Sequence, residues 1–375
     1  MNTTITYTGA GQPDDEDFSL KSEKPAAKPE QVLFARYEEV AWSEELQWDT
    51  RYRKQRLLGA GGQGAVYLAD RLGADGFLRP VALKVFSPET YCDAESYLKD
   101  MQACARISAR VALIQSDHVV DIHDFIERCG IRLMEMEWLD GYDLREVLSQ
   151  KMLDLTTEKV SIERRQYVER VILTSGPVQP RLLPGVAIAV LRDCLSGLAA
   201  LHAAGIVHGD IKPANIMLTR TGNAKIIDIG TAIDLRGSTV RRMWSPAYAA
   251  PEVLEGGDNT PRSDLASLGY VLVEMLAGRP VFEGWGSIPE LILEKKTLDR
   301  RVAQILPPEV SSNELLLNLC QQLIAPNPEQ RFMSAQSADV GRKGAADFHR
   351  QLVKGNLASE YDYDIRGWLE QLAAA

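Results

Sequence analysis

The sequence predicts an α+β protein of two lobes, a small strand-rich lobe with one main helix and a larger helical lobe after it. Between residues 52 and 139, short β-branched and apolar runs are interrupted by Gly, Pro and charged residues, which is typical of strands. After Asp143 the apolar spacing becomes helical, most clearly in residues 184–204 and 262–277. With 375 residues, of which 45% are apolar and 25% charged, the chain is long enough to bury a core in each lobe.

The first lobe contains four runs that predict strands and one that predicts a helix. The helical stretch extends from about Ala94 to Leu113 and divides the other runs into two pairs. The strand-like runs are AVYLAD, PVALKVF, HVVDIHDF and IRLMEMEWL. Their β-branched and apolar residues are bounded by turn-forming and charged positions, so we expect short strands.

The two ends of the chain differ from the lobes. Residues 1–30 are poor in large apolar side chains, so we expect a disordered acidic tail. Residues 31–51 form an N-terminal extension whose apolar residues could line a helix. Residues 341–375 form a C-terminal helical tail. One apolar face of that tail, suited to packing on the large lobe, is made by Ile365, Trp368, Leu369 and Leu372.

Composition argues against several classes of protein. The formal net charge of −10 disfavours a nucleic-acid partner, because such proteins usually carry a basic surface. The five cysteines have no CxxC spacing, so we expect neither a disulfide framework nor a zinc site, and a cytoplasmic, reducing location suits them best. The N-terminus lacks the layout of a signal peptide, and we find no run of the roughly 18 apolar residues that a membrane span needs. We therefore expect no membrane in this chain.

The segment LLGAGGQGAVYLAD predicts a phosphate-binding loop. Gly59, Gly61 and Gly64 have a GxGxxG spacing, and Val66 follows them. Glycines allow the backbone to approach phosphate groups and to present its N–H groups to them. A dinucleotide site requires a helix directly after the glycines, whereas AVYLAD continues as a strand. The context therefore argues against a dinucleotide-binding fold.

Three later segments complete a set of motifs. HGDIKPANIM (208–217) has an Asp two residues after the His and an Asn five residues later, IIDIGTA (226–232) contains Asp228, and SPAYAAPEVL (245–254) contains an APE sequence. Together with Lys84 in VALK, these segments resemble the motifs of eukaryotic-type Ser/Thr protein kinases of the kind found in bacteria.

The resemblance covers about residues 52–340 and implies a bilobal protein kinase fold. The N-lobe would be residues 52–139 and the C-lobe residues 140–340, with an insert at about 151–180. Downstream, the match to the family's central helix implies that Asp264 braces the catalytic loop and that Arg331 pairs with Glu252.

The resemblance also implies a role for each matched residue. Asp210 would orient the acceptor hydroxyl and accept its proton, while Lys84 would hold ATP phosphates and Lys212 would offset charge on the transferred phosphoryl group. The implied catalytic residues are Asp210, Lys212, Lys84 and Asn215. The implied Mg²⁺ ligands are Asn215 and Asp228, and Mn²⁺ is the alternative ion for them. The residues implied to bind ATP are Gly59, Gly61, Gly64, Val66, Ala82, Lys84, Asp100, Met136, Glu137, Leu139 and Met217.

Two positions depart from the family pattern. The acid expected to pair with Lys84 is a Glu in the family, and here the register and helical periodicity favour Asp100 over Glu95. Gly209 replaces the Arg that usually grips a phosphate on the activation loop. We therefore expect activity that does not depend on phosphorylation of that loop.

Three functions remain open at this stage. The first is phosphorylation of Ser or Thr hydroxyls on protein substrates, including autophosphorylation. A pseudokinase or scaffold without transfer is the second, supported by Asp100 and Gly209. The third is a small-molecule phosphotransferase, because HGD also occurs in that class. Lys212 and the segment SPAYAAPEVL favour the protein kinase.

Two regions lie outside the family motifs. The charged insert at 151–180 predicts a solvated excursion. A docking surface for a partner is the alternative for the insert, and also for the tail at 360–375. The sequence does not identify the protein substrate.

Overall fold

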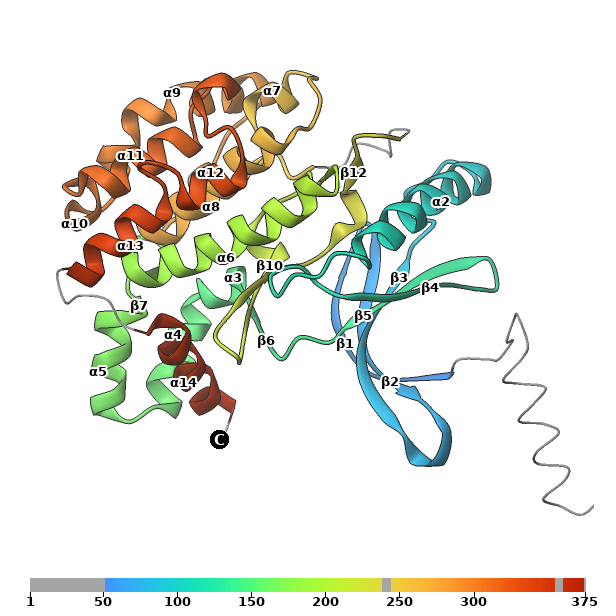
Figure 1. The fold of residues 1–375 in the computed structure, drawn as a ribbon. Coiled ribbons are helices and arrows are strands. Elements are labelled where there is room, and N and C mark those ends of the chain that lie inside the picture. Colours follow the sequence, from blue (N-terminus) through green and yellow to red (C-terminus); the bar gives the residue numbers. More distant parts are fainter. Residues whose placement is uncertain (1–50, 238–243, 355–359, 374–375) are drawn as a thin grey trace, which may run out of the picture. The chain divides into compact units, whose positions relative to one another are not determined.

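The computed structural model describes residues 51–237, 244–354 and 360–373. The expected disordered tail, and the N-terminal extension apart from Arg51, lie outside these residues. Five strands form one antiparallel sheet in the order β1-β2-β3-β5-β4 (Figure 1). They are β1 (Arg51–Gly61), β2 (Gly64–Leu72), β3 (Leu78–Phe86), β4 (Ile122–Arg128) and β5 (Ile131–Glu137).

The register of this sheet places Lys84 on a central strand. Lys84 lies opposite Val66 of β2 and Met134 of β5. The predicted helix is α2 (Ala94–Val111), which begins where the Asp93 carboxylate accepts a hydrogen bond from the backbone N–H of Ser96 at 2.7 Å. Its buried residues recur at three- and four-residue steps, as the sequence predicted, and they are Tyr97, Met101, Ala103, Cys104, Ile107, Ser108 and Val111.

Two helices, α6 (Pro184–Ala203) and α8 (Pro261–Ala277), contact each other in the core of the second lobe. Residues 263–277 of α8 are all buried, and most of them are apolar. A helix of this composition is stable only when other elements surround it. The other helices of this lobe are α3 (Leu144–Val147), α7 (Pro251–Leu254), α9 (Ile288–Ile305), α10 (Pro308–Ser311), α11 (Glu314–Leu323), α12 (Ala335–Val340) and α13 (Ala345–Lys354). Short 3₁₀ turns are η1 (Ala74–Gly76), η2 (Pro213–Asn215), η3 (Ile229–Thr231) and η4 (Pro328–Gln330).

Short strands bring two polar loops together. Residues 208–215 lie between β9 (Ile206–Val207) and β10 (Ile216–Thr219), and residues 227–232 lie between β11 (Ala224–Ile226) and β12 (Ile233–Asp234). Since β10 pairs with β11 and β9 pairs with β12, both ends of one loop are tied to the ends of the other. A third strand, β6 (Gly141–Asp143), pairs with β10.

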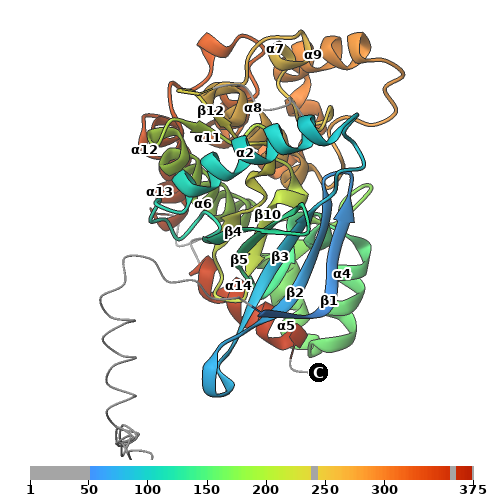
Figure 2. The same ribbon diagram turned by 90° about the vertical axis from the view of Figure 1, so that its right-hand side faces the viewer.

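The insert folds into helices, which the sequence did not predict, and many of its residues are exposed, as expected of a solvated excursion. It forms α4 (Gln150–Lys159), α5 (Ile162–Val171) and the hairpin of β7 (Leu173–Thr174) with β8 (Arg181–Leu182). The C-terminal helix α14 (Tyr361–Ala373) lies beside α4 in both views (Figures 1 and 2). The Trp368 indole N–H donates to Thr156 Oγ1 at 3.1 Å, and the Tyr167 hydroxyl donates to Asp364 Oδ1 at 2.8 Å. The tail covers part of the apolar side of the insert.

One helix of the second lobe, α6, is unusually apolar. Within the described residues, α6 is long and apolar enough by composition to cross a membrane. It packs against α8, α12 and β11, and residues such as Leu191, Leu195 and Leu198 are fully buried. The apolar composition of α6 is that of a core helix.

Candidate active site

The glycine-rich segment forms the hairpin between β1 and β2, with Gly61 opposite Gly64. Gly64 has φ +132°, and a Cβ built there would lie 2.0 Å from the Val85 carbonyl oxygen. No other residue type fits that position without a shift of β3. A Cβ built at Gly59 or Gly61 would meet nothing within 4 Å, so there is open space around these two glycines of the hairpin.

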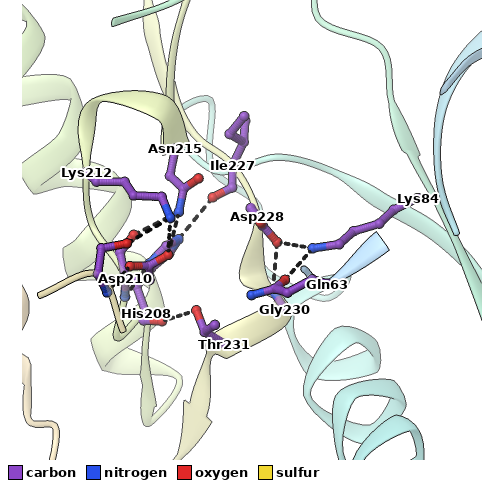
Figure 3. Close-up of polar contacts among 11 residues, drawn as sticks. Gln63, Lys84, His208, Asp210, Lys212, Asn215, Ile227, Asp228, Gly230 and Thr231 are labelled. Atoms are coloured by element: carbon purple, nitrogen blue, oxygen red, sulfur yellow. Dashed lines mark hydrogen bonds and ion pairs between the residues drawn. The ribbon is translucent and has the colours of Figure 1, made fainter. Parts of the chain in front are cut away.

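Lys84 and Asp228 meet beneath this hairpin (Figure 3). Lys84 is buried, and its Nζ donates to Asp228 Oδ1 at 2.5 Å and to Gln63 Oε1 at 2.8 Å. Asp228 has left-handed backbone angles (φ 59°), and its Oδ1 also accepts from the Gly230 N–H at 3.2 Å. Although burial raises the pKa of the Asp228 carboxyl, the charge and hydrogen bond of Lys84 outweigh burial and hold that pKa below its ordinary value.

The expected pairing of Lys84 with Asp100 is therefore corrected. Among the described residues, the only ion pair of Lys84 is the one with Asp228, and neither Asp100 nor Glu95 contributes. Asp100 lies half-exposed beside the buried stripe of α2, and Glu95 is exposed. An Asp side chain is one methylene shorter than the Glu of the family, which limits its reach toward β3.

The second polar cluster surrounds Asp210. Its Oδ2 accepts from Lys212 Nζ at 2.6 Å, and its Oδ1 accepts from the backbone N–H of Ser245 at 3.0 Å. Asn215 donates from Nδ2 to the Asp210 backbone oxygen at 2.8 Å, which ties the loop to the start of β10. Lys212 Nζ also donates to Ser245 Oγ at 3.0 Å. These bonds hold the Asp210 carboxylate in one orientation.

Asp264 holds the loop itself. This buried residue of α8 accepts from the backbone N–H groups of His208 and Gly209, each at 2.9 Å, as the resemblance implied. Gly209 has φ +77°, a conformation that favours glycine, and a Cβ there would lie 3.3 Å from the Thr231 carbonyl oxygen. His208 is buried with Nε2 3.0 Å from the Ile227 oxygen, so the two loops are also joined directly.

A cavity of about 380 Å³ joins the two clusters. Nine of the residues predicted for the site line it: Gly59, Gly61, Gly64, Val66, Lys84, Asp210, Lys212, Asn215 and Asp228. Its other lining residues are Ala60, Gly62, Gln63, Arg145, Ala214, Trp244 and Ser245. Sequence reasoning did not assign Gln63, Arg145 or Trp244 to the site. Only Gln63 had a local signal, because it lies within the GxGxxG segment.

Six predicted ATP-binding residues do not line this cavity. Ala82 and Met136 are buried cross-strand neighbours in β3 and β5, and Met217 lies opposite Asp143 in the small sheet. The Glu137 carboxylate accepts from Lys225 Nζ at 2.5 Å. The residues outside the cavity are Ala82, Asp100, Met136, Glu137, Leu139 and Met217.

The oxygen atoms of the site fit a shared Mg²⁺ ion. Within the described residues, no group of three or more His, Cys, Asp or Glu could hold a metal alone. Asp228 and Asn215 line the cavity and offer a carboxylate and an amide oxygen. Mg²⁺ favours such hard oxygen ligands and usually keeps waters and substrate phosphates in its shell. The two residues therefore fit an ion that arrives with a nucleotide.

Comparison with known proteins assigns the family. The family model described as protein kinase domain matches residues 52–339. The chain is 27% identical over 304 residues to the serine/threonine-protein kinase PrkC of Bacillus subtilis, covering 80% of this chain and 41% of that protein. It is 31% identical over 296 residues to PknD of Mycobacterium tuberculosis, covering 76% and 38%. The chain thus belongs to the protein kinase family and spans about two fifths of the length of these relatives.

Solved structures agree on the fold. The PknI kinase domain of Mycobacterium tuberculosis superposes with a TM-score of 0.52 at 23% identity, covering 80% of this chain and 95% of that one. At this identity the likeness speaks to the fold alone. The predicted bilobal protein kinase fold is confirmed.

Proposed function

We propose that this protein transfers the γ-phosphoryl group of Mg-ATP to Ser or Thr hydroxyls of protein substrates, including its own. One observation carries the proposal. Asp210, held by Lys212 and Ser245, and the Lys84–Asp228 pair line one cavity beneath the glycine hairpin. Phosphoryl transfer needs little covalent chemistry from the protein, so positioned charges of this kind suffice.

Each residue has a defined task in this reaction. The Asp210 carboxylate, fixed by hydrogen bonds from Lys212, Asn215 and the Ser245 N–H, aligns the acceptor hydroxyl and takes its proton. Lys212 and Lys84 place positive charge near the acceptor and phosphate ends of the cavity. Asn215 and Asp228 would hold Mg²⁺, which supplies neutralisation of phosphate charge when bound. The glycine hairpin covers the phosphates and limits water.

A protein acceptor is favoured over a small molecule by the segment that follows Trp244. Ser245 contacts both Lys212 and Asp210, and the Tyr248 hydroxyl donates to the buried Glu274 at 2.7 Å. The segment is thus attached to the catalytic loop at one point and to α8 at another. An anchored backbone beside the acceptor site suits an extended peptide, and the relatives in the comparison bear the name of serine/threonine-protein kinases.

The setting and partners form part of the same proposal. The described cysteines are all free thiols, which supports a reducing, cytoplasmic setting. The apolar faces of the insert and tail pack on each other, so any docking by residues 151–180 or 360–375 falls to their outward faces.

The test is mass spectrometry of the purified chain after incubation with Mg-ATP and casein, beside Asp228→Asn. Asp154→Asn is the matched control, because Asp154 is an exposed aspartate on α4, away from the cavity. We expect phosphate on Ser or Thr with the wild type and Asp154→Asn only. Retained ATP binding without any phosphoprotein would contradict the proposal and favour a pseudokinase or a small-molecule phosphotransferase.

A further inference from the structure

Lys295 of α9 is a lysine whose amine lies wholly inside the second lobe. Its exposed fraction is 0%, and among the described residues it has no carboxylate partner. Its Nζ donates one hydrogen bond, to the backbone oxygen of Ala247 at 2.6 Å. Burying an ammonium group is costly unless the surroundings compensate for the lost water, so this placement requires a reason.

Two aromatic rings supply part of that compensation. The Lys295 Nζ lies 4.1 Å from the ring centre of Tyr270 and 4.0 Å from that of Phe282. These rings pack edge to face, with centres 5.2 Å apart. Tyr270 contacts Lys295 through its ring, and its buried hydroxyl has no hydrogen-bond partner among the described residues. Aromatic faces attract a cation, although less strongly than water or a carboxylate would hold it.

Burial lowers the pKa of the Lys295 amine well below its ordinary value. The hydrogen bond does not depend on the protonation state of the Lys295 amine, because both the ammonium and the neutral amine can donate to Ala247. In either protonation state, Lys295 therefore places an N–H donor at the Ala247 carbonyl oxygen.

Ala247 belongs to the segment that approaches the acceptor site. The backbone N–H groups of Tyr248 and Ala249 donate to the Ser245 oxygen at 2.9 and 3.0 Å, so residues 245–249 form one turn. Ser245 in turn donates its N–H to Asp210. Lys295 is therefore linked to Asp210 indirectly. Its amine binds the Ala247 carbonyl oxygen, and the turn that contains Ala247 binds Asp210 through the Ser245 N–H.

We propose that Lys295 is a positioning residue that fixes the turn of residues 245–249 and thereby sets the affinity for the protein substrate but not for ATP. This inference rests on the proposed function. A methionine of similar length would fill the same space without burying a polar amine, so folding alone does not require the lysine. The amine is retained because it holds the Ala247 carbonyl.

The test compares the wild type with Lys295→Met and with Lys296→Met in the full chain. Lys296 is the matched control, because it is the next residue of the same helix, is 44% exposed and pairs with Glu255 instead. Three quantities are measured: the melting temperature, the KM values for casein and ATP, and hydrogen exchange of the amides in residues 244–251.

For Lys295→Met we expect an unchanged or higher melting temperature and an unchanged KM for ATP. The KM for casein and the exchange rates of the Tyr248 and Ala249 amides should each rise about tenfold, the effect of losing one strong hydrogen bond. Lys296→Met should behave as the wild type does.

Unchanged exchange in residues 244–251, or KM values for casein and ATP that rise together, would overturn the inference. If the wild type phosphorylates no protein at all, the proposed function fails. The exchange comparison then still decides whether Lys295 holds the turn.

Discussion

Arg331 donates two hydrogen bonds to Glu252, from Nη1 at 2.6 Å and from Nη2 at 2.8 Å, with the Arg331 side chain fully buried. The same guanidinium also donates to the backbone oxygens of Ala325 and Arg262. It therefore joins α7, which follows residues 245–249, to the start of α8 and to the residues just after α11. The pairing was predicted from the sequence, and the structure adds that it is bidentate and that the Arg331 side chain is buried.

Removing one partner of this pair should destabilise the fold strongly. Glu252→Gln leaves the Arg331 charge buried without its counter-ion, which we expect to lower the free energy of unfolding by about 3–5 kcal/mol. Urea denaturation measures the change. The control is Glu329→Gln, which breaks the exposed pair with Arg262 and should not move the midpoint. Equal midpoints for both variants would contradict the assigned role.

Lys84 should matter far more to catalysis than Asp100. Lys84→Met removes the charge between Gln63 and Asp228 and should slow phosphorylation by about 10²–10³-fold, as loss of one preorganised charged donor does. Asp100→Asn should have a much smaller effect, since Asp100 makes no ion pair with Lys84. Initial rates at saturating Mg-ATP compare the two variants. A loss of rate in Asp100→Asn as large as that in Lys84→Met would support the pairing of Lys84 with Asp100.

Phosphorylation of the loop after Asp228 should not control activity. Gly209 offers no guanidinium to receive a phosphate, and Thr231 is buried with its hydroxyl donating to the His208 oxygen at 3.4 Å. Replacing Ser238 and Thr239 with Ala should therefore leave turnover nearly intact. Steady-state rates of the double variant are compared with those of wild type that has been incubated with Mg-ATP beforehand, and rates lower by tenfold or more in the variant would contradict this.

Asp193 should make stability depend on pH in the acid range. Burial raises the pKa of this carboxyl to about 6, although it accepts a hydrogen bond from the Ala224 N–H at 2.8 Å. The folded protein therefore favours the protonated form. The contribution of the Asp193 carboxyl to the free energy of unfolding is fully present below about pH 4, the ordinary pKa of Asp. It is lost as pH rises to about 6.

Asp193→Asn should remove this contribution while keeping an oxygen that accepts from Ala224. The difference in free energy of unfolding between variant and wild type should increase from pH 4 to pH 6 and stay constant above pH 7. Urea titrations at four pH values measure it. A difference that does not vary with pH would show that Asp193 titrates normally.

The C-terminal helix should stabilise the whole second lobe. Trp368 is fully buried and bonded to Thr156, so Trp368→Ala leaves a large cavity and should cost about 3–5 kcal/mol. Tyr363 lies on the same helix and is 69% exposed, so Tyr363→Ala is the matched control. Thermal unfolding compares them. If Trp368→Ala melts as Tyr363→Ala does, the helix does not contribute to the folded lobe.

Strand β1 and helices α4 and α5 were not predicted from the sequence. The family, the order of strands β2 to β5 with helix α2 among them, and much of the polar site were predictable from it. These features depend on local patterns. The five-residue spacing from Asp210 to Asn215 is closed by hydrogen bonds within the loop, and the three- and four-residue periodicity of α2 follows from the burial of one helix face.

Which distant groups meet depends on the tertiary structure. Lys84 and Asp228 are 144 positions apart, and Trp368 and Thr156 are 212 apart, so no spacing rule relates them. The choice of Asp228 over Asp100, the packing of the tail on the insert, and the buried donor of Lys295 under Ala247 all depend on how whole elements pack. Such packing sums many weak contacts over the entire chain, and a local sequence pattern does not contain that sum.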